Sequence, residues 1–348
     1  MLFRILSFIL ICLLSSTNLA AQQTKILNAE KHNEYGLVYT LPKTAFRIDI
    51  TIVRETQVAG PFYKYAKIFG GTTDVISKNS KREWVEGVTV TPFGVPDSDN
   101  RYLMQLKTGA TAFIAVADDN MLLAINKEDV ENPSLSIPKV ADIHNNPAPD
   151  INNYLKYVNE DFISAISDYK KAQLMAEELQ EIREAKLSLT RGTAETMPTD
   201  GRQLEIMLNS LEDQETSLLN AFRGIRYVEK EIRSFTFIPD PENDVTSAYY
   251  PDVKVKVEIT EIQTPELPVD TKGEEKKLPK DAVIYRIPGT VKLNISTDSQ
   301  QLFSNIFEIA QTGINFGLSP SLFSDKKEPS FATFNPTNGA LQELGVVK

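Results

Sequence analysis

Acidic and amide side chains form the cluster in this sequence that is best suited to bind a ligand or perform catalysis. Asp97 and Asp99 precede Asn100 in the segment GVPDSDN, residues 94–100. Clustered oxygen ligands suit a calcium ion or the hydroxyl groups of a carbohydrate, and two carboxylates are what glycoside hydrolysis requires. Asp and Asn also cap turns with their own side chains, and a plain turn is the simpler interpretation. We expect a loop here and take Asp97 and Asp99 as candidate ligand-binding residues.

A second candidate site is aromatic. The aromatic residues follow Gly60-Pro61, which ends the preceding strand pattern; they are Phe62, Tyr63, Tyr65 and Phe69. Exposed aromatic rings bind sugars or partner proteins, whereas buried rings belong to the core. Packing in the core or between domains is the simpler interpretation, and Tyr63 and Tyr65 are the candidate ligand-binding residues if the rings are exposed.

Other catalytic chemistries lack the residues that they require. The only histidines are His32 and His144, both in predicted connecting segments, and the only cysteine is Cys12. A Ser-His-Asp triad, a histidine-rich zinc site and a thiol nucleophile are therefore hard to assemble. The glutamates of residues 177–184 are interspersed with basic residues, which is typical of a solvated helix face. We predict no catalytic residue, metal ligand or cofactor, and the pattern favours a non-enzymatic protein.

The N-terminus is typical of a secretory signal peptide. Arg4 is the only charge in residues 1–21, an apolar run extends from Ile5 to Leu14, and Ala20-Ala21 precede Gln22. A membrane anchor needs about 20 apolar residues, about twice this run. We expect cleavage near residue 21, loss of Cys12 with the peptide, and no membrane span afterwards. The expected location is periplasmic, outer-membrane-associated or secreted.

The charge balance limits the partners. The chain has 37 Lys and Arg against 47 Asp and Glu, a net charge of −10. Binding to nucleic acid depends on basic residues that neutralise phosphate, and no basic stripe offsets the acidic balance. We therefore expect no nucleic-acid partner, and an envelope protein or a glycan remains as the expected partner.

Hydrophobic periodicity divides the chain after the signal peptide. Alternation that places Phe46, Ile48, Ile50 and Ile52 on one face predicts strands in an N-terminal β domain, residues 22–130. A Pro/Asn-rich connector (131–150), a helical hairpin (151–223) and a C-terminal β domain (224–348) with a solvated loop at 263–281 follow. The predicted fold class is α+β and β-rich. Two possibly related β modules, sandwich or barrel-like, are expected around an inserted antiparallel α-helical hairpin.

The hairpin also has terminal signals. Apolar residues recur at helical spacing over 167–189 and again over 204–222. Gly192 suits a helix C-cap, Asp200 suits a helix start, and Gly224 ends the second helix.

Two segments far apart in the chain resemble each other. Residues 38–48 and 284–294 both read aliphatic-Tyr-x-aliphatic-Pro-x-Thr, and each is followed later by a polar turn, at 119–122 and 338–341. Chance similarity between strand-rich sequences is the alternative to a true repeat. If the repeat is real, Pro42 and Pro288 are expected at strand edges or bulges.

Several motifs resemble one protein family. They are VYTLPKT (38–44), AGPFYKYAKIFGG (59–71), GVPDSDN (94–100), IREAKLSLTRG (182–192), PTDGRQLEIMLNSLEDQE (198–215), YRIPGT (285–290), IAQTGI (309–314) and FNPTNGALQEL (334–344). The chain is identified on these motifs as a member of domain-of-unknown-function family 4831, a family of exported envelope proteins. The resemblance implies an envelope location and assigns no activity.

Three functions remain open from the sequence. The first is a non-enzymatic envelope protein that binds or scaffolds a partner through its β surfaces or its hairpin. The second is a carbohydrate hydrolase that uses acidic residues alone, which predicts two carboxylates converging in a cleft. The third is a small-ligand binding protein, which predicts a closed apolar pocket between the β modules.

Overall fold

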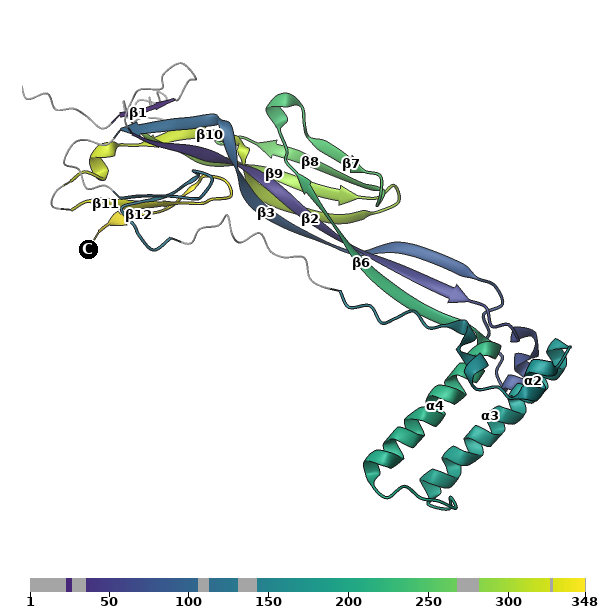
Figure 1. Cartoon of the computed structure of the whole chain (residues 1–348). Coiled ribbons are helices and arrows are strands. Elements are labelled where there is room, and N and C mark those ends of the chain that lie inside the picture. The colour runs from purple at the N-terminus through teal and green to yellow at the C-terminus, as the bar shows by residue number, and fades with distance from the viewer. Residues whose placement is uncertain are drawn as a thin grey trace, which may run out of the picture. The chain divides into compact units, whose positions relative to one another are not determined.

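The computed structural model describes residues 23–26, 36–105, 113–130, 143–267, 282–325 and 328–347. Three four-stranded sheets and a helical hairpin dominate these residues, which confirms the β-rich α+β class (Figure 1). The predicted signal peptide, Cys12 and His32 lie outside the described residues, as do most of the connector and of the loop at 263–281.

The chain forms two compact units, each assembled from separate segments. Unit 1 combines residues 1–49, 88–140 and 234–348, and unit 2 combines residues 50–87 and 141–233. Three long strands therefore begin in one unit and end in the other: β2 (Leu37–Val58), β3 (Ser80–Gln105) and β6 (Ile225–Phe237). The contiguous domains expected from the sequence (22–130, 131–150, 151–223 and 224–348) stay a prediction.

These long strands form the first sheet, in the order β1-β3-β2-β6, where β1 is Gln23–Ile26. The predicted alternation in β2 is confirmed, because Phe46, Ile48, Ile50 and Ile52 are all buried. The predicted loop at 94–100 is wrong, since β3 runs through it without a break. β1 pairs only with Tyr102–Gln105, so near Pro96 one side of β3 has no partner strand among the described residues, and such an edge tolerates proline.

The second sheet has the order β10-β9-β8-β7. Its strands are β7 (Ser247–Tyr250), β8 (Val255–Gln263), β9 (Val283–Ser296) and β10 (Gln301–Leu318). Between β9 and β10 the register shifts, because Ile287 pairs with Ile314 whereas Gly289 pairs with Ile309. Pro288 thus faces a bulge formed by residues 310–313, as expected for a residue that cannot donate to the ladder.

The third sheet, in the order β12-β11-β5-β4, shows that the internal similarity is structural. Each long pair, β2–β3 and β9–β10, is followed by a short hairpin; these hairpins are β4 (Ile114–Val116) with β5 (Leu122–Ile125), and β11 (Ser330–Phe334) with β12 (Leu341–Val346). The Thr40 amide donates to Asn120 O at 2.9 Å, and the equivalent Arg286 amide donates to Gly339 O at 3.0 Å. Both acceptors have positive φ, 66° and 76°. The two β modules therefore share contacts as well as sequence.

Unit 2 contains the hairpin, made of α3 (Asp168–Arg191) and α4 (Gly201–Arg223), which lie side by side in Figure 1. The predicted termini are confirmed: Gly192 caps α3 with φ 70°, the Asp200 side chain accepts from the Gln203 amide, and Gly224 follows α4. Shorter elements complete the unit: η1 (Tyr63–Tyr65), η2 (Ala66–Gly70), η4 (Ile151–Lys156) and α2 (Glu160–Ser164).

Each unit has its own core. In unit 1, Tyr39, Tyr102, Met104, Ile125 and Phe334 belong to one buried cluster. In unit 2, apolar side chains of α2, α3 and α4 pack with rings from η4 and from the segment around η1; they include Phe62, Tyr154, Phe162, Met175, Leu179, Leu218 and Phe222.

The two glycines of β3 supply a test of the packing. A Cβ on Gly94 would overlap the carbonyl oxygen of Pro336, whereas a Cβ on Gly87 meets nothing within 4 Å. Overpacking against backbone typically costs about 1–3 kcal/mol. We expect Gly94→Ala to lower the free energy of unfolding by about 3 kcal/mol and Gly87→Ala to change it by less than about 0.5 kcal/mol. Urea unfolding of both variants measures this, and equal midpoints would contradict the packing of β3 against Pro336.

The ion pairs of Glu215 make the stability of the helical hairpin depend on pH. Arg183 Nε donates to Glu215 Oε1 at 2.7 Å and Lys186 Nζ donates to Glu215 Oε2 at 2.9 Å. These hydrogen bonds lower the pKa of Glu215. Because the folded pKa is below the unfolded one, this stabilisation is present above the unfolded pKa of about 4.3 and is lost as the pH falls through the folded value.

We therefore expect Glu215→Gln to remove part of the acid sensitivity of the hairpin. Urea midpoints measured by helical circular dichroism between about pH 6 and pH 3 should fall less steeply than in the wild type. Glu205→Gln, an exposed site on the same helix, is the control and should keep the wild-type slope. An unchanged slope for Glu215→Gln would show that these ion pairs do not stabilise the hairpin.

Candidate functional site

A polar cleft of about 260 Å³ lies within unit 1. Its walls come from β2, β3, β9 and β10, together with η5 (Pro241–Asn243), the turn that follows β6. The lining residues are Lys43, Asp97, Asp99, Asn100, Asp240, Glu242, Asn243, Arg286, Gln311, Gly313 and Asn315. Apart from Gly313, every one of them has a charged or amide side chain.

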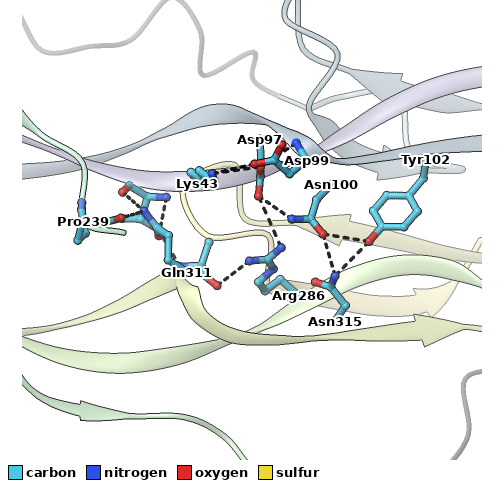
Figure 2. A network of polar contacts seen from close by, with 11 residues as sticks. Lys43, Asp97, Asp99, Asn100, Tyr102, Pro239, Arg286, Gln311 and Asn315 are labelled. Carbon is cyan, nitrogen blue, oxygen red and sulfur yellow. Dashed lines mark hydrogen bonds and ion pairs between the residues drawn. The ribbon is translucent and has the colours of Figure 1, made fainter. Parts of the chain in front are cut away.

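Asp97 is the buried centre of the network in Figure 2, with 1% of its side chain exposed. Its Oδ1 accepts the Asp99 amide at 3.1 Å and lies 3.5 Å from Lys43 Nζ. Its Oδ2 accepts Asn100 Nδ2 at 2.7 Å and lies 3.8 Å from Arg286 Nη2. Both carboxylate oxygens therefore have fixed partners, and two cations share one buried negative charge.

Arg286 also lines the cleft and is 6% exposed. Its Nη1 donates to the Ala310 carbonyl at 2.8 Å, but its buried Nε has no hydrogen-bond partner among the described residues. Burial lowers the pKa of Arg286, although the charge of Asp97 opposes this change. Buried polar atoms of this kind are normally hydrogen-bonded, so the Nε is an unpaired donor in the interior of unit 1.

Asn315 stands directly across the ladder from Arg286. Its Nδ2 donates to Asn100 Oδ1 and to the Tyr102 hydroxyl oxygen, both at 3.0 Å (Figure 2). Its Oδ1 is a second buried atom without a partner in the described part of the chain. Burial raises the pKa of Tyr102, which keeps its hydroxyl protonated next to these amides.

Gln311 fixes the position of the bulge. Its Oε1 accepts the Thr44 amide at 3.1 Å, and its Nε2 donates to the carbonyls of Thr44 and Pro239, both at 2.8 Å. The Thr44 hydroxyl accepts the Ala310 amide at 3.0 Å and donates to Thr337 O at 2.9 Å. One buried amide therefore joins β2, the segment before η5 and β10.

Carboxylates outnumber cations at the cleft. Lys43 Nζ lies 3.4 Å from Asp99 Oδ2, whose side chain is 81% exposed. Burial alone would lower the pKa of Lys43, but the charges of Asp97, Asp240 and Asp99 together raise it. Asp240 Oδ2 accepts Asn243 Nδ2 at 2.9 Å. Four carboxylates and two cations give the cleft a net negative charge at neutral pH.

The candidate site residues predicted from the sequence belong to two different units. Asp97 and Asp99 both line the cleft. Tyr63 and Tyr65 lie in η1 of unit 2, where the Tyr65 ring contacts Tyr169 at 5.9 Å between centroids. The structure brings Asp97 and Asp99 together but does not place either tyrosine among the residues that line this cleft. Ligand binding at these four residues stays a prediction.

Sequence reasoning missed most of the cleft. Arg286, Gln311 and Asn315 lie in segments that read as ordinary strands. Lys43 and Arg286 belong to the two repeated motifs. The charge of Arg286 among the apolar residues of its motif was the one sequence signal that could have marked it as a cleft residue. Asp240 and Glu242 follow β6 in a turn whose position relative to β3 no local pattern reveals.

No group of three or more His, Cys, Asp or Glu side chains among the described residues is arranged to hold a metal ion. None of the helices in this part of the chain is both long enough and apolar enough to cross a membrane.

Comparison with known proteins decides the family. The family model named Domain of unknown function (DUF4831) matches residues 35–342. The chain belongs to the DUF4831 family. The resemblance noted in the sequence is therefore confirmed, and all the cleft residues, from Lys43 to Asn315, lie inside the DUF4831 match. No curated protein and no solved structure matches the chain.

The buried ion pair of the DUF4831 cleft is testable by a double-mutant cycle. Removing one partner of a buried pair typically costs about 3–5 kcal/mol, because the remaining charge is uncompensated. Since Lys43 also faces Asp97, we expect Arg286→Met to cost about 3 kcal/mol. The double variant Asp97→Asn/Arg286→Met should recover most of this loss.

Urea unfolding of the wild type, both single variants and the double variant gives the coupling energy. Additive effects of the two substitutions would show that Asp97 and Arg286 are not coupled and would contradict the network.

Proposed function

We propose that this chain is an exported, non-enzymatic binding protein of the cell envelope, and that the cleft of unit 1 is its ligand site. The observation that carries the proposal is the lining of the cleft, in which every residue except Gly313 has a charged or amide side chain.

The arrangement of Asp97 favours binding over hydrolysis. A carboxylate that acts as an acid, base or nucleophile needs an oxygen free to reach the reacting atom. Both oxygens of Asp97 are already engaged, by the Asp99 amide and Lys43 on one side and by Asn100 and Arg286 on the other. Asp97 therefore organises the cleft, and its neighbours are left to contact the ligand.

The lining chemistry favours a glycan over an apolar small molecule. Sites for drug-like ligands are mostly apolar with a few polar groups, whereas this cleft is lined by charged and amide side chains. Sugar hydroxyl groups both donate and accept, so they match a surface that offers carboxylates, amides and a guanidinium together.

Export is supported by the N-terminal pattern. Arg4, the apolar run from Ile5 to Leu14, and Ala20-Ala21 are arranged as in a signal peptide. An envelope location places the cleft where glycans and envelope proteins are available as partners. Immunoblotting of fractionated cells tests this part, because a precursor-sized chain confined to the cytoplasm would contradict export.

Ligand binding is tested by thermal unfolding of the mature protein with a panel of mono- and disaccharides at about 10 mM each. A ligand that binds only the folded state raises the melting temperature, and a concentration of 100 times Kd corresponds to about 2.7 kcal/mol. We expect at least one sugar to stabilise the wild type and to stabilise Asp99→Ala less, because Asp99 lines the cleft. Asp298→Ala, another exposed aspartate of unit 1, should respond as the wild type does. No shift with any sugar would refute the glycan-binding proposal.

A further inference from the structure

We propose that β12 (Leu341–Val346) is an interface at which two copies of this chain pair edge to edge, with the two strands antiparallel. This interaction goes beyond ligand binding in the cleft and does not depend on it. Three features of unit 1 carry the proposal: an unprotected strand edge, an apolar row of side chains that ends there, and a strand sequence that is complementary to itself.

The free edge of β12 has backbone groups available for pairing. In the described part of the chain β12 pairs only with β11, beside which it lies in Figure 1. The Val347 amide donates to Pro329 O at 2.8 Å, and the register of the pair is regular from Val346 to Glu343. Because backbone groups alternate in direction along an antiparallel strand, the amides and carbonyls of Leu344 and Val346 point away from β11.

An apolar row of side chains crosses the third sheet and ends at this edge. Its members lie opposite one another on successive strands, from β4 to β12; they are Ile114, Ile125, Ala332 and Leu344. Ile125 and Ala332 are fully buried in the core of unit 1, whereas Leu344 is 47% exposed. Val346, two residues further along the same face, is 49% exposed. A further strand beside β12 would extend the sheet and cover both side chains.

The longer edges of the other sheets have features that oppose such pairing. Pro96 on β3 has no amide hydrogen to donate. On β6, the Asn145 side chain accepts the Lys230 amide at 2.8 Å and donates to the Lys230 carbonyl at 2.7 Å. On β10, the Asn305 side chain accepts the Ile306 amide at 2.9 Å. β12 contains no proline and carries exposed apolar side chains, so it is the edge best suited to pair with another strand.

The sequence of β12 matches a second copy of itself. With a two-fold axis at Gly345, Leu344 of each copy lies next to Val346 of the other copy, and both exposed apolar side chains are covered. The backbone groups that point away from β11 then face each other, as an antiparallel ladder requires.

Charge favours the same arrangement. Glu343 is the one charged residue of β12, and its carboxylate lies 2.6 Å from Lys127 Nζ of the same chain. In the antiparallel arrangement Glu343 lies across from Val347 of the second copy, so no like charges are opposed. Parallel pairing in register would instead place the two Glu343 carboxylates side by side, which is unfavourable.

Sedimentation of the full mature protein between about 1 and 200 μM tests the proposal. A contact between two strands is small, so we expect a dimer with a dissociation constant in the micromolar range. We expect Leu344→Lys and Val346→Pro each to weaken this dimer about tenfold or more. Neither change removes a hydrogen bond to β11, so the urea midpoints should stay close to that of the wild type.

Ile306→Lys makes the same kind of change at an exposed position on β10 and is the matched control, expected to dimerise as the wild type does. A wild type that stays monomeric at about 200 μM would overturn the proposal. Wild-type dimerisation of Leu344→Lys, or equal weakening by Ile306→Lys, would show that the copies do not associate through β12 and would overturn it as well.

A spin label at Gln342→Cys tests the direction of the two strands. The antiparallel arrangement about Gly345 places the two labelled positions about 20 Å apart along the strands. Parallel pairing in register would place them about 5 Å apart. We expect the longer separation in distance measurements by electron paramagnetic resonance on the dimer, and the shorter one would overturn the antiparallel interface.

Discussion

Side chains that replace backbone partners hold unit 1 together. The β2 strand belongs to one sheet and the β9–β10 pair to another, so no ladder joins them. Gln311 instead bonds to both the amide and the carbonyl of Thr44, and the Tyr39 hydroxyl bonds to both the amide and the carbonyl of Ile284. Burial raises the pKa of Tyr39, so its hydroxyl stays protonated. Unpaired buried backbone groups are costly, and these two side chains satisfy them where the two repeats meet.

The cleft is a consequence of this junction. Gln311 reaches Thr44 because it lies in the bulge opposite Pro288, where the ladder between β9 and β10 is interrupted. The bulge is narrow, since a Cβ on Gly289 would overlap Thr312 and a Cβ on Gly313 would overlap Ile287. The same interruption leaves the Ala310 carbonyl to be satisfied by Arg286, which turns the guanidinium toward Asp97.

Local patterns in the sequence identified several of the elements but not the site. Alternation identified the buried face of β2, and Gly192 and Asp200 marked the ends of the hairpin helices, because these signals act over a few residues. The turn-forming composition of 94–100 was misleading. The Asp97 side chain does accept the Asp99 amide, as in a turn, but this hydrogen bond lies inside a strand.

The cleft depends on residue pairs that are far apart in the chain. Asp97 and Arg286 are separated by most of the domain, and each looks ordinary within its own segment. The two repeats also differ after their shared threonine: β2 buries Phe46 and Ile48, whereas β9 buries Leu293 and Ile295. When the two motifs are aligned, the buried positions of β9 fall one residue later than the buried positions of β2. A repeat recognised from the motif therefore identifies the topology but not which side chains face the cleft.

Hydrogen exchange at the Thr44 amide tests the central claim, that the Gln311 side chain joins the two repeats and so builds the cleft. We expect this amide to exchange slowly in the wild type, because Gln311 Oε1 accepts its hydrogen bond in a buried setting. We expect much faster exchange in Gln311→Ala and wild-type exchange in Gln300→Ala, a change in the exposed turn before β10. Rapid exchange of the Thr44 amide in the wild type, or continued protection in Gln311→Ala, would contradict a joining role for Gln311.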